Sequence, residues 1–201
     1  IFCTLQYQPE KSTNPLGGVF QKQFLMIEMI SKIIPKDWVI YIKEHPSQFV
    51  TDYLRYGDFF RGKDFYNKIV SLKNCILVPI EQNSFDMIDN SIAVASVSGT
   101  VLWESVMREK FCLSFGNSWF KGCEGILETR NLSDLRENLN VIENKIKPEL
   151  NKVKLFAYTI DSLKFYAAVG GPNHLKIKNL SNEKNAEIHF KAFNWLLKNE
   201  I

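Results

Sequence analysis

The 201-residue chain has no long apolar run, no closely spaced pair of cysteines and no block of like charge. No apolar run reaches about 18 residues, which excludes a spanning helix, and no signal peptide is visible. The four cysteines form no Cys-x-x-Cys pair, and three of them sit in apolar runs. This usage is typical of reduced, buried thiols in a cytoplasmic protein.

The sequence also gives little support for a metal site, for covalent catalysis or for nucleic-acid binding. The three histidines, His45, His174 and His189, have no metal-ligand spacing with one another or with cysteine. A Gly-x-Ser-x-Gly elbow, a Walker A motif and a Gly-x-Gly-x-x-Gly fingerprint are all absent. The net charge of +3 comes from acidic and basic residues mixed along the chain. We therefore expect no metal, no cofactor and no nucleic-acid partner.

What the chain does contain is the composition of a globular protein, with 45% hydrophobic and 23% charged residues. A chain of this size can bury about 70% of its unfolded surface. The first residue is Ile1, which opens directly into a strand-like run. We therefore expect that another part of the protein precedes this one.

Apolar runs alternate with helical patterns over the first part of the chain. Amphipathic segments with apolar residues three and four positions apart indicate helices at 18–34, 63–74 and 100–110. Alternation of this kind, with nearly continuous apolar strands, is typical of a parallel sheet covered on both faces. We predict an α/β, Rossmann-like sheet of five to six strands. The expected strands are 2–8, 39–44, 75–80, 91–98 and 111–116, with a short further strand near 125–128.

Further helices are expected after the sheet. One should begin near an N-cap at Ser133, one should cover 147–169, and one should end the chain. We predict a Rossmann-like domain over 1–170 and a C-terminal linker and helix over 171–201. The apolar arc of the last helix is wide enough that we expect two partners: this domain and an absent N-terminal half. The alternative is that 149–169 covers the whole arc.

The stretch Lys43-Glu44-His45-Pro46 ends a predicted strand without a turn glycine. Ligands bind beyond the carboxyl ends of parallel strands, and Pro46 keeps His45 extended. His45 is thus a candidate hydrogen-bond donor to a phosphate. Lys43 and Glu44 alternate faces, so at most one of them shares the crevice with His45. The alternative is a surface His-Pro turn.

A second candidate site is the stretch Ser96-Val97-Ser98-Gly99-Thr100, which joins a strand to a helix. Gly99 permits a tight turn, free N–H groups at the helix start can bind an anion, and Ser96, Ser98 and Thr100 add hydroxyls. Glu104, one turn into the helix, could accept hydrogen bonds from a ribose. The alternative is an ordinary N-cap at Ser98, with Glu104 complementing the helix dipole.

Two more loops should open at the same edge. The loop after the first strand carries Glu10 and the pair Gly17-Gly18, which can cradle a phosphate, admit an acceptor or serve only as a loop. The loop after the fifth strand offers Asn117, Ser118, Trp119 and Lys121 as lining for a base or a sugar. Aromatic residues in such a loop are as often a hydrophobic lid.

Taken together, these motifs resemble the bacterial capsule and surface polysaccharide biosynthesis family of GT-B glycosyltransferases. The resemblance covers roughly residues 2–130, through K-E-H-P, S-x-S-G-T with its following glutamate, and "CLSFGNSWFKGCEGI". Such enzymes have two Rossmann-like halves, and this chain resembles the C-terminal half, which binds the nucleotide of an activated sugar.

The resemblance implies roles for individual residues. His45 would contact the donor phosphates, Ser96, Ser98 and Thr100 would face the nucleotide phosphate, and Glu104 would hold the ribose. No metal is implied, and Glu10 is the one candidate base that this chain offers.

The expected activity is transfer of a sugar from a CMP-, CDP- or UDP-linked donor to a polysaccharide or glycolipid acceptor. It would take place in the cytoplasm or at the inner face of the membrane, by peripheral association, and this half alone should be inactive. The alternatives are a nucleotide-sugar 2-epimerase, a glycerol-phosphate transferase of the same architecture, and a non-catalytic interaction module.

Overall fold

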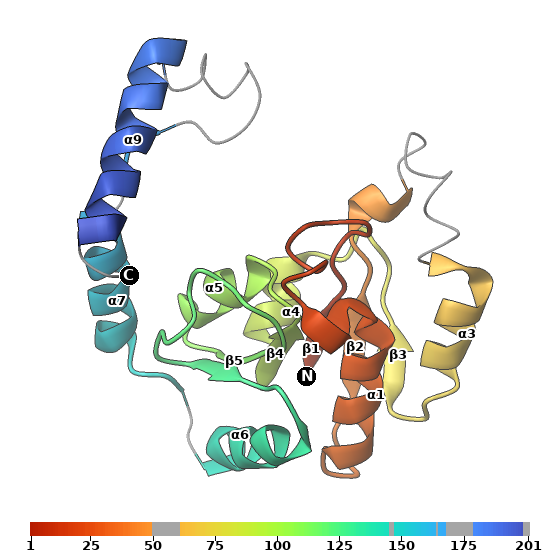
Figure 1. The fold of residues 1–201 in the computed structure, drawn as a ribbon. Coiled ribbons are helices and arrows are strands. Elements are labelled where there is room, and N and C mark those ends of the chain that lie inside the picture. Colours follow the sequence, from red (N-terminus) through yellow and green to blue (C-terminus); the bar gives the residue numbers. More distant parts are fainter. Residues whose placement is uncertain (50–60, 145–146, 164, 168–178, 199–201) are drawn as a thin grey trace. The chain divides into compact units, whose positions relative to one another are not determined.

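A six-stranded, entirely parallel sheet forms the centre of the computed structural model (Figure 1). The structure describes residues 1–49, 61–144, 147–163, 165–167 and 179–198. The strands are β1 (Phe2–Thr4), β2 (Ile40–Lys43), β3 (Cys75–Leu77), β4 (Ala93–Ser96), β5 (Phe111–Ser114) and β6 (Ile126–Glu128). Their order, β3-β2-β1-β4-β5-β6, is that of a Rossmann-like sheet. The predicted α/β parallel fold is confirmed.

The helices are η1 (Gly18–Gln21), α1 (Gln23–Ile33), η2 (Pro46–Phe49), α3 (Lys63–Val70), α4 (Ser84–Asp89), α5 (Val101–Val106), α6 (Leu132–Asn144), α7 (Leu150–Leu163) and α9 (Asn182–Lys198). Helix α4 was not predicted. The sequence feature that marks its start is the N-cap residue Asn83. The Asn83 side chain accepts hydrogen bonds from the N–H groups of Phe85 (2.8 Å) and Asp86 (3.3 Å). Six residues are too few for a clear amphipathic period.

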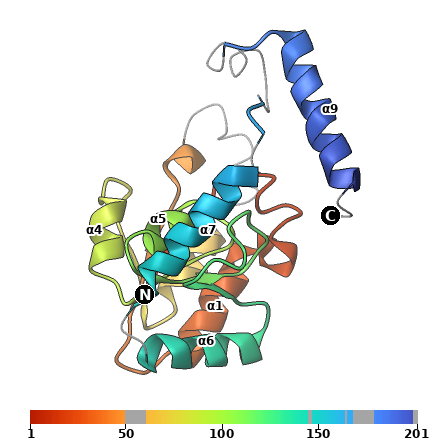
Figure 2. The same ribbon diagram turned by 90° about the vertical axis from the view of Figure 1, so that its left-hand side faces the viewer.

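Successive side chains along the strands point to opposite faces of the sheet and pack into two separate hydrophobic cores. Cys3, Ala95 and Leu113 point to one face, where α1, α3 and α6 contribute Ile27, Ile69 and Leu135. Phe2, Val94 and Cys112 point to the other face, where α4, α5 and α7 contribute Ile88, Leu102 and Val153. Figure 2 shows α1 and α6 close together, apart from α4 and α5. The sheet is therefore covered on both faces, as the apolar strands predicted.

Two helix ends differ from the predictions. Asn131, not Ser133, caps α6, because its Oδ1 accepts hydrogen bonds from the N–H groups of Ser133 (2.8 Å) and Asp134 (3.0 Å). Helix α7 ends at Leu163, short of the predicted end at 169, and residues 164 and 168–178 lie outside the described ranges.

The chain divides into two compact units, Ile1–Phe156 and Ala157–Ile201, and the division falls within α7. In the second unit the rings of Phe165 and Trp195 lie 6.2 Å apart. Helix α9 has no fully buried residue: Phe190, Phe193 and Leu197 are exposed, and Trp195 is half-buried. No helix in the described ranges is long and apolar enough to cross a bilayer.

Candidate functional site

A cavity of about 360 Å³ opens where the strand order reverses, between β1 and β4 at their carboxyl ends. This is the position at which open parallel sheets bind ligands. The predicted loops after β2 and β4 do meet there, but not as neighbours, because β1 lies between those strands. His45 and Ser98 therefore follow strands that lie on either side of β1. The lining residues are Thr4, Leu5, Gln6, Glu10, Ser12, Lys43, Glu44, His45, Pro46, Ser84, Ser98, Gly99, Thr100, Val101 and Glu104.

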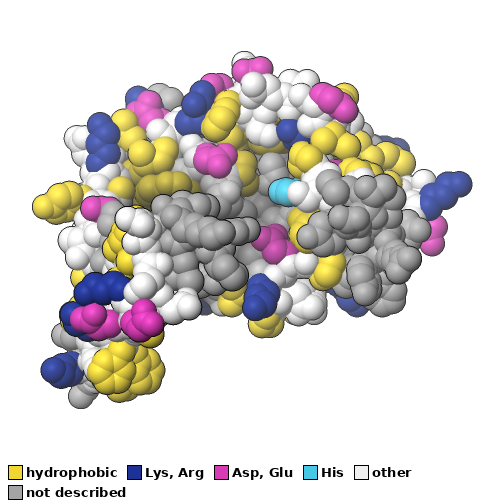
Figure 3. Space-filling model, turned by 90° about the horizontal axis from the view of Figure 1, so that it is seen from above, with side chains coloured by type: hydrophobic (Ala, Val, Ile, Leu, Met, Phe, Trp, Pro, Cys, Tyr) yellow, Lys and Arg dark blue, Asp and Glu magenta, His cyan; other side chains and the backbone are white. Residues whose placement is uncertain are grey.

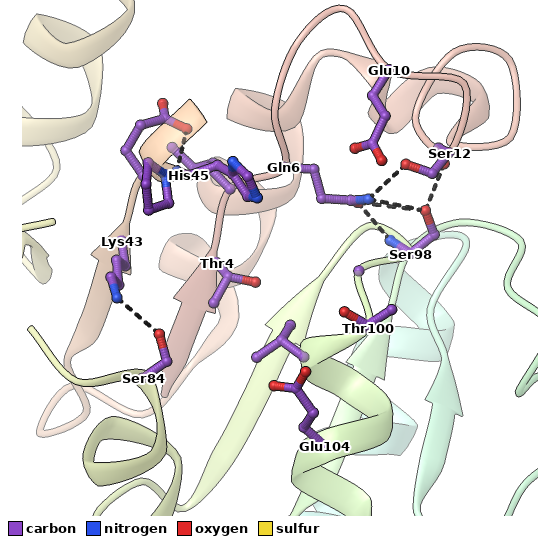
Figure 4. Close-up of a pocket in the computed structure, with 15 residues that line it drawn as sticks. Thr4, Gln6, Glu10, Ser12, Lys43, His45, Ser84, Ser98, Thr100 and Glu104 are labelled. Carbon is purple, nitrogen blue, oxygen red and sulfur yellow. Dashed lines mark hydrogen bonds between the residues drawn. The ribbon is translucent and has the colours of Figure 1, made fainter. Parts of the chain in front are cut away.

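His45 lies at one wall of this cavity with an exposed imidazole (Figure 4). The backbone N–H of Ser47 donates to its Nδ1 at 3.2 Å. In the neutral ring, that bond places the proton on Nε2, by the logic of hydrogen-bond complementarity. The backbone N–H of His45 donates to Glu44 Oε1 at 2.8 Å, and η2 begins at Pro46. His45 is thus a positioned Nε2–H donor at the cavity wall.

Lys43, the last residue of β2, and Glu44 both line the cavity, so the prediction that at most one of them shares it with His45 was wrong. Lys43 Nζ donates to the Gln82 carbonyl (2.6 Å) and to Ser84 Oγ (2.8 Å) beside the cavity. Burial lowers the pKa of the Lys43 ammonium, and the charge of Glu81 partly offsets this effect. Lys43 thus lies on the His45 side of the strand, with two of its three N–H donors engaged.

Glu44 borders the cavity, but its carboxylate belongs to a buried ion pair. Glu44 Oε2 accepts from Arg61 Nε at 2.8 Å and from the Tyr66 hydroxyl at 2.9 Å, and both paired side chains are 4% exposed. Burial and the Glu44 charge raise the pKa of Tyr66, which keeps its hydroxyl a donor. The pair anchors the segment that carries His45.

The hydroxyls of the serine motif mainly hold the loops together. Ser96 is fully buried and donates to the Thr4 carbonyl at 3.2 Å, so it does not line the cavity. Ser98 Oγ donates to the Ser12 carbonyl at 2.5 Å. Thr100 is exposed and lines the cavity without capping the helix through its side chain. Of the three predicted hydroxyls, Thr100 is therefore the one best placed for a ligand.

Gly99 and the helix after it show how tightly this wall is built. A Cβ on Gly99 would lie 3.1 Å from Ser96 Oγ, so a side chain here would crowd the strand end. Helix α5 has six residues, and the N–H groups of Leu102 and Glu104 already bond to the Gly99 and Thr100 carbonyls. The predicted anion site at this helix start thus has fewer free donors than expected.

Two carboxylates face the cavity from different elements. Glu10 is exposed in the loop after β1, and Glu104 is half-buried on α5 (Figure 4). Figure 3 shows acidic and basic side chains on this hollowed face of the molecule. The cavity therefore combines donors, from His45 and Lys43, with acceptors, from Glu10 and Glu104.

Asn117 and Ser118 do not line this cavity. Asn117 lines a second cavity, and Ser118 Oγ is buried without a hydrogen-bond partner in the described part of the chain. The loop after β5 opens at the predicted edge, but β5 lies one strand further from the switch point than β4. These two residues and the β4 motif are thus not part of one pocket.

The sequence reasoning missed Gln6, the residue that joins the two walls. The N–H of Ser98 donates to Gln6 Oε1 at 2.8 Å, and Gln6 Nε2 donates to Ser12 Oγ at 3.1 Å. The Gln23 side chain in turn accepts from the Gln6 N–H (2.7 Å) and donates to its carbonyl (2.8 Å). Gln48 makes the same pair of bonds to Gln8. The sequence feature that could have revealed Gln6 is the alternation of polar residues, Gln6 and Gln8, directly after a buried strand.

No protein-family model matches the chain, and no curated protein matches it significantly. The described residues hold no cluster of three or more His, Cys, Asp or Glu side chains suited to a metal ion.

Proposed function

We propose that this chain is the donor-binding half of a metal-independent GT-B glycosyltransferase that acts on capsular or surface polysaccharide. The observation that carries the proposal is the cavity at the β1/β4 switch point, where loops after three strands converge. Its volume of about 360 Å³ is in the range of ligand sites. The resemblance of the K-E-H-P and S-x-S-G-T motifs to those of GT-B glycosyltransferases is the reason for proposing a nucleotide sugar as the ligand.

In the proposed complex the donor spans the two walls of the cavity. The Nε2–H of His45 and the ammonium of Lys43 donate to the diphosphate or monophosphate, and Thr100 adds a hydroxyl. Glu104, on the opposite wall, accepts from ribose hydroxyls. This division suits a nucleotide sugar because its phosphate oxygens accept hydrogen bonds, whereas its ribose hydroxyls can donate them.

The proposed reaction transfers the sugar in one displacement. The acceptor oxygen bonds to the anomeric carbon, and the bond from that carbon to the phosphate oxygen breaks. The phosphate leaves with both electrons of that bond, and donation from His45 stabilises its growing charge. The acceptor proton passes to a carboxylate, for which Glu10 is the candidate in this chain. The acceptor and the N-terminal half of the enzyme are the proposed partners, at the cytoplasmic face of the membrane.

Calorimetric titration of the chain with CMP, CDP, UDP and GDP tests the proposal. We expect one of these nucleotides to bind, and His45→Ala to weaken that binding about tenfold to a hundredfold. This range follows from the roughly 1.5–3 kcal/mol contributed by a hydrogen bond to a charged group. His189→Ala, which removes an imidazole from α9, is the matched control.

Two outcomes contradict this function. If none of the four nucleotides binds, the alternative of a non-catalytic interaction module is favoured. Equal affinity of His45→Ala and the unaltered chain makes His45 a turn residue only. In the complete enzyme, His45→Ala should also abolish transfer while the circular dichroism spectrum stays unchanged.

A further inference from the structure

A second cavity, of about 460 Å³, opens at the same edge of the sheet, beyond β5 and β6. Its lining comes from the loop after β1 (Pro15–Phe20), from the ends of β5 and β6, and from Asn117, Lys121 and Arg130. None of these residues lines the first cavity. The strand order explains the separation, because β5 and β6 lie on the far side of β4 from β2.

Backbone hydrogen bonds join the loops beside the second cavity to one another and to the end of β4. The N–H of Asn117 donates to the Leu16 carbonyl at 3.0 Å, and the N–H of Gly116 donates to the Val97 carbonyl at 2.6 Å. A Cβ on Gly17 would lie 2.6 Å from the Thr13 carbonyl oxygen, and one on Gly116 would lie 2.9 Å from Val97 Cγ1. The glycines thus allow the loops to close on each other, next to Ser98 of the first cavity.

The polar side of the second cavity carries two cations and one carboxylate. Glu128 Oε2 lies 3.3 Å from Lys121 Nζ and also accepts from Arg130 Nη2. Burial alone would raise the pKa of Glu128, but the hydrogen bonds from Arg130 and Lys121 outweigh it and lower the pKa. The three groups therefore sum to one positive charge at neutral pH. The Arg130 guanidinium retains N–H donors, since it has five.

We propose that this second cavity binds a sugar that carries a carboxylate, as one residue of the acceptor glycan. Arg130 donates to the carboxylate in the two-bond geometry that a guanidinium favours, and Lys121 adds its charge. The Asn117 side-chain amide forms hydrogen bonds with the hydroxyls of the sugar. Leu16 and Val19, both exposed, give the apolar side against which the C–H face of a sugar ring packs. The role of this sugar as part of the acceptor rests on the proposed glycosyltransferase activity, whereas the binding of an acidic sugar in this cavity does not.

The charge of the site selects a carboxylate over a phosphate monoester. A carboxylate brings one negative charge, which matches the single net positive charge of Lys121, Glu128 and Arg130. A phosphate monoester brings about −1.5 to −2 at neutral pH, and the excess would face the ionised Glu128. Asp134 accepts from the backbone N–H of Arg130 at 2.8 Å and does not line the cavity.

Ligand-observed saturation-transfer NMR on this chain tests the proposal with glucuronate, glucose and glucose 6-phosphate as probes. We expect glucuronate to bind at least tenfold more tightly than either of the other two. Arg130→Gln should weaken glucuronate binding about tenfold or more, and Arg130→Lys should weaken it less. Arg136→Gln, an exposed arginine of α6 outside the cavity, is the matched control and should bind like the unaltered chain.

Several results overturn the inference. Equal binding of glucose and glucuronate, tighter binding of glucose 6-phosphate, or unchanged binding by Arg130→Gln each does so. Loss of glucuronate binding in His45→Ala would place the sugar in the first cavity and would also overturn it. Nucleotide titrations remain a separate readout, so failure of glucuronate to bind leaves the proposed donor site standing. Thermal unfolding of each variant shows that its fold is intact.

Discussion

The backbone N–H of Ser98 donates a 2.8 Å hydrogen bond to Oε1 of Gln6, a residue 92 positions earlier in the chain. Both residues are buried, and they follow β4 and β1, the two strands at which the sheet order reverses. The same side chain donates through Nε2 to Ser12 Oγ. One glutamine thus fixes the relative position of two loops that line the first cavity.

Gln6→Leu should destabilise the fold, because it leaves the buried N–H of Ser98 without its acceptor. We expect a loss of about 1–3 kcal/mol in the free energy of unfolding, measured by urea denaturation, and faster hydrogen exchange at the Ser98 amide. Gln21→Leu, at an exposed position in η1, is the control and should change little. Equal stabilities of the two variants would show that the Gln6 amide is dispensable.

Arg61→Met should be strongly destabilising, because it leaves the Glu44 carboxylate charged and buried. Removal of one partner of a buried ion pair costs about 3–5 kcal/mol. The double variant Glu44→Gln/Arg61→Met should lose less than the sum of the two single variants in urea denaturation. Lys32→Met removes one partner of an exposed pair with Glu28 and should give no measurable change. Additive losses in the double variant would contradict the coupling.

Stability should decrease as the pH rises above about 8.5, where cysteine thiols ionise in an unfolded chain. Burial raises the pKa of Cys3 and Cys112, both fully buried, and raises that of Cys123 to about 11. The folded state then keeps protons that the unfolded state loses, so the free energy of unfolding falls with pH. The stability contribution is complete below the unfolded pKa and is lost progressively toward the raised folded pKa.

Urea denaturation in reducing buffer, at several pH values from about 7.5 to about 9.5, measures this slope. Each buried thiol contributes up to about 1.4 kcal/mol per pH unit above the unfolded pKa. Cys112→Ala should make the slope shallower, even though the cavity it creates also lowers stability at every pH. A slope unchanged by that substitution would mean that Cys112 does not keep its proton in the folded state.

Phe190→Ser and Phe193→Ser on α9 should leave the stability of this chain within about 0.5 kcal/mol, as exposed substitutions do. The two side chains are 66% and 59% exposed. If α9 meets an N-terminal half, the same substitutions should weaken that association in a pull-down with the complete protein's first half. Phe120→Ser, at a fully buried position, is the control that should unfold readily. A large loss of stability from the α9 substitutions would support coverage by 149–169 instead.

The sequence by itself determined the layers of this protein. Apolar runs such as 91–98, separated by amphipathic segments, require strands buried on both faces, and a parallel sheet with helices on each side satisfies them. That arrangement brings the loops with Glu10, His45 and Thr100 to one edge, because parallel strands end on the same side.

Only the tertiary structure decided which of those loops form one cavity. The periodicity of a segment is local, whereas the strand order depends on packing between distant segments, and it placed β1 between β2 and β4. The same order put Asn117 in the second cavity, with Lys121 and Arg130. The direction of the Ser96 and Ser98 hydroxyls was equally undetermined by local pattern, since their partners, Thr4 and Ser12, are 92 and 86 residues away in the chain. A hydrogen bond over such a separation exists only once the sheet has assembled.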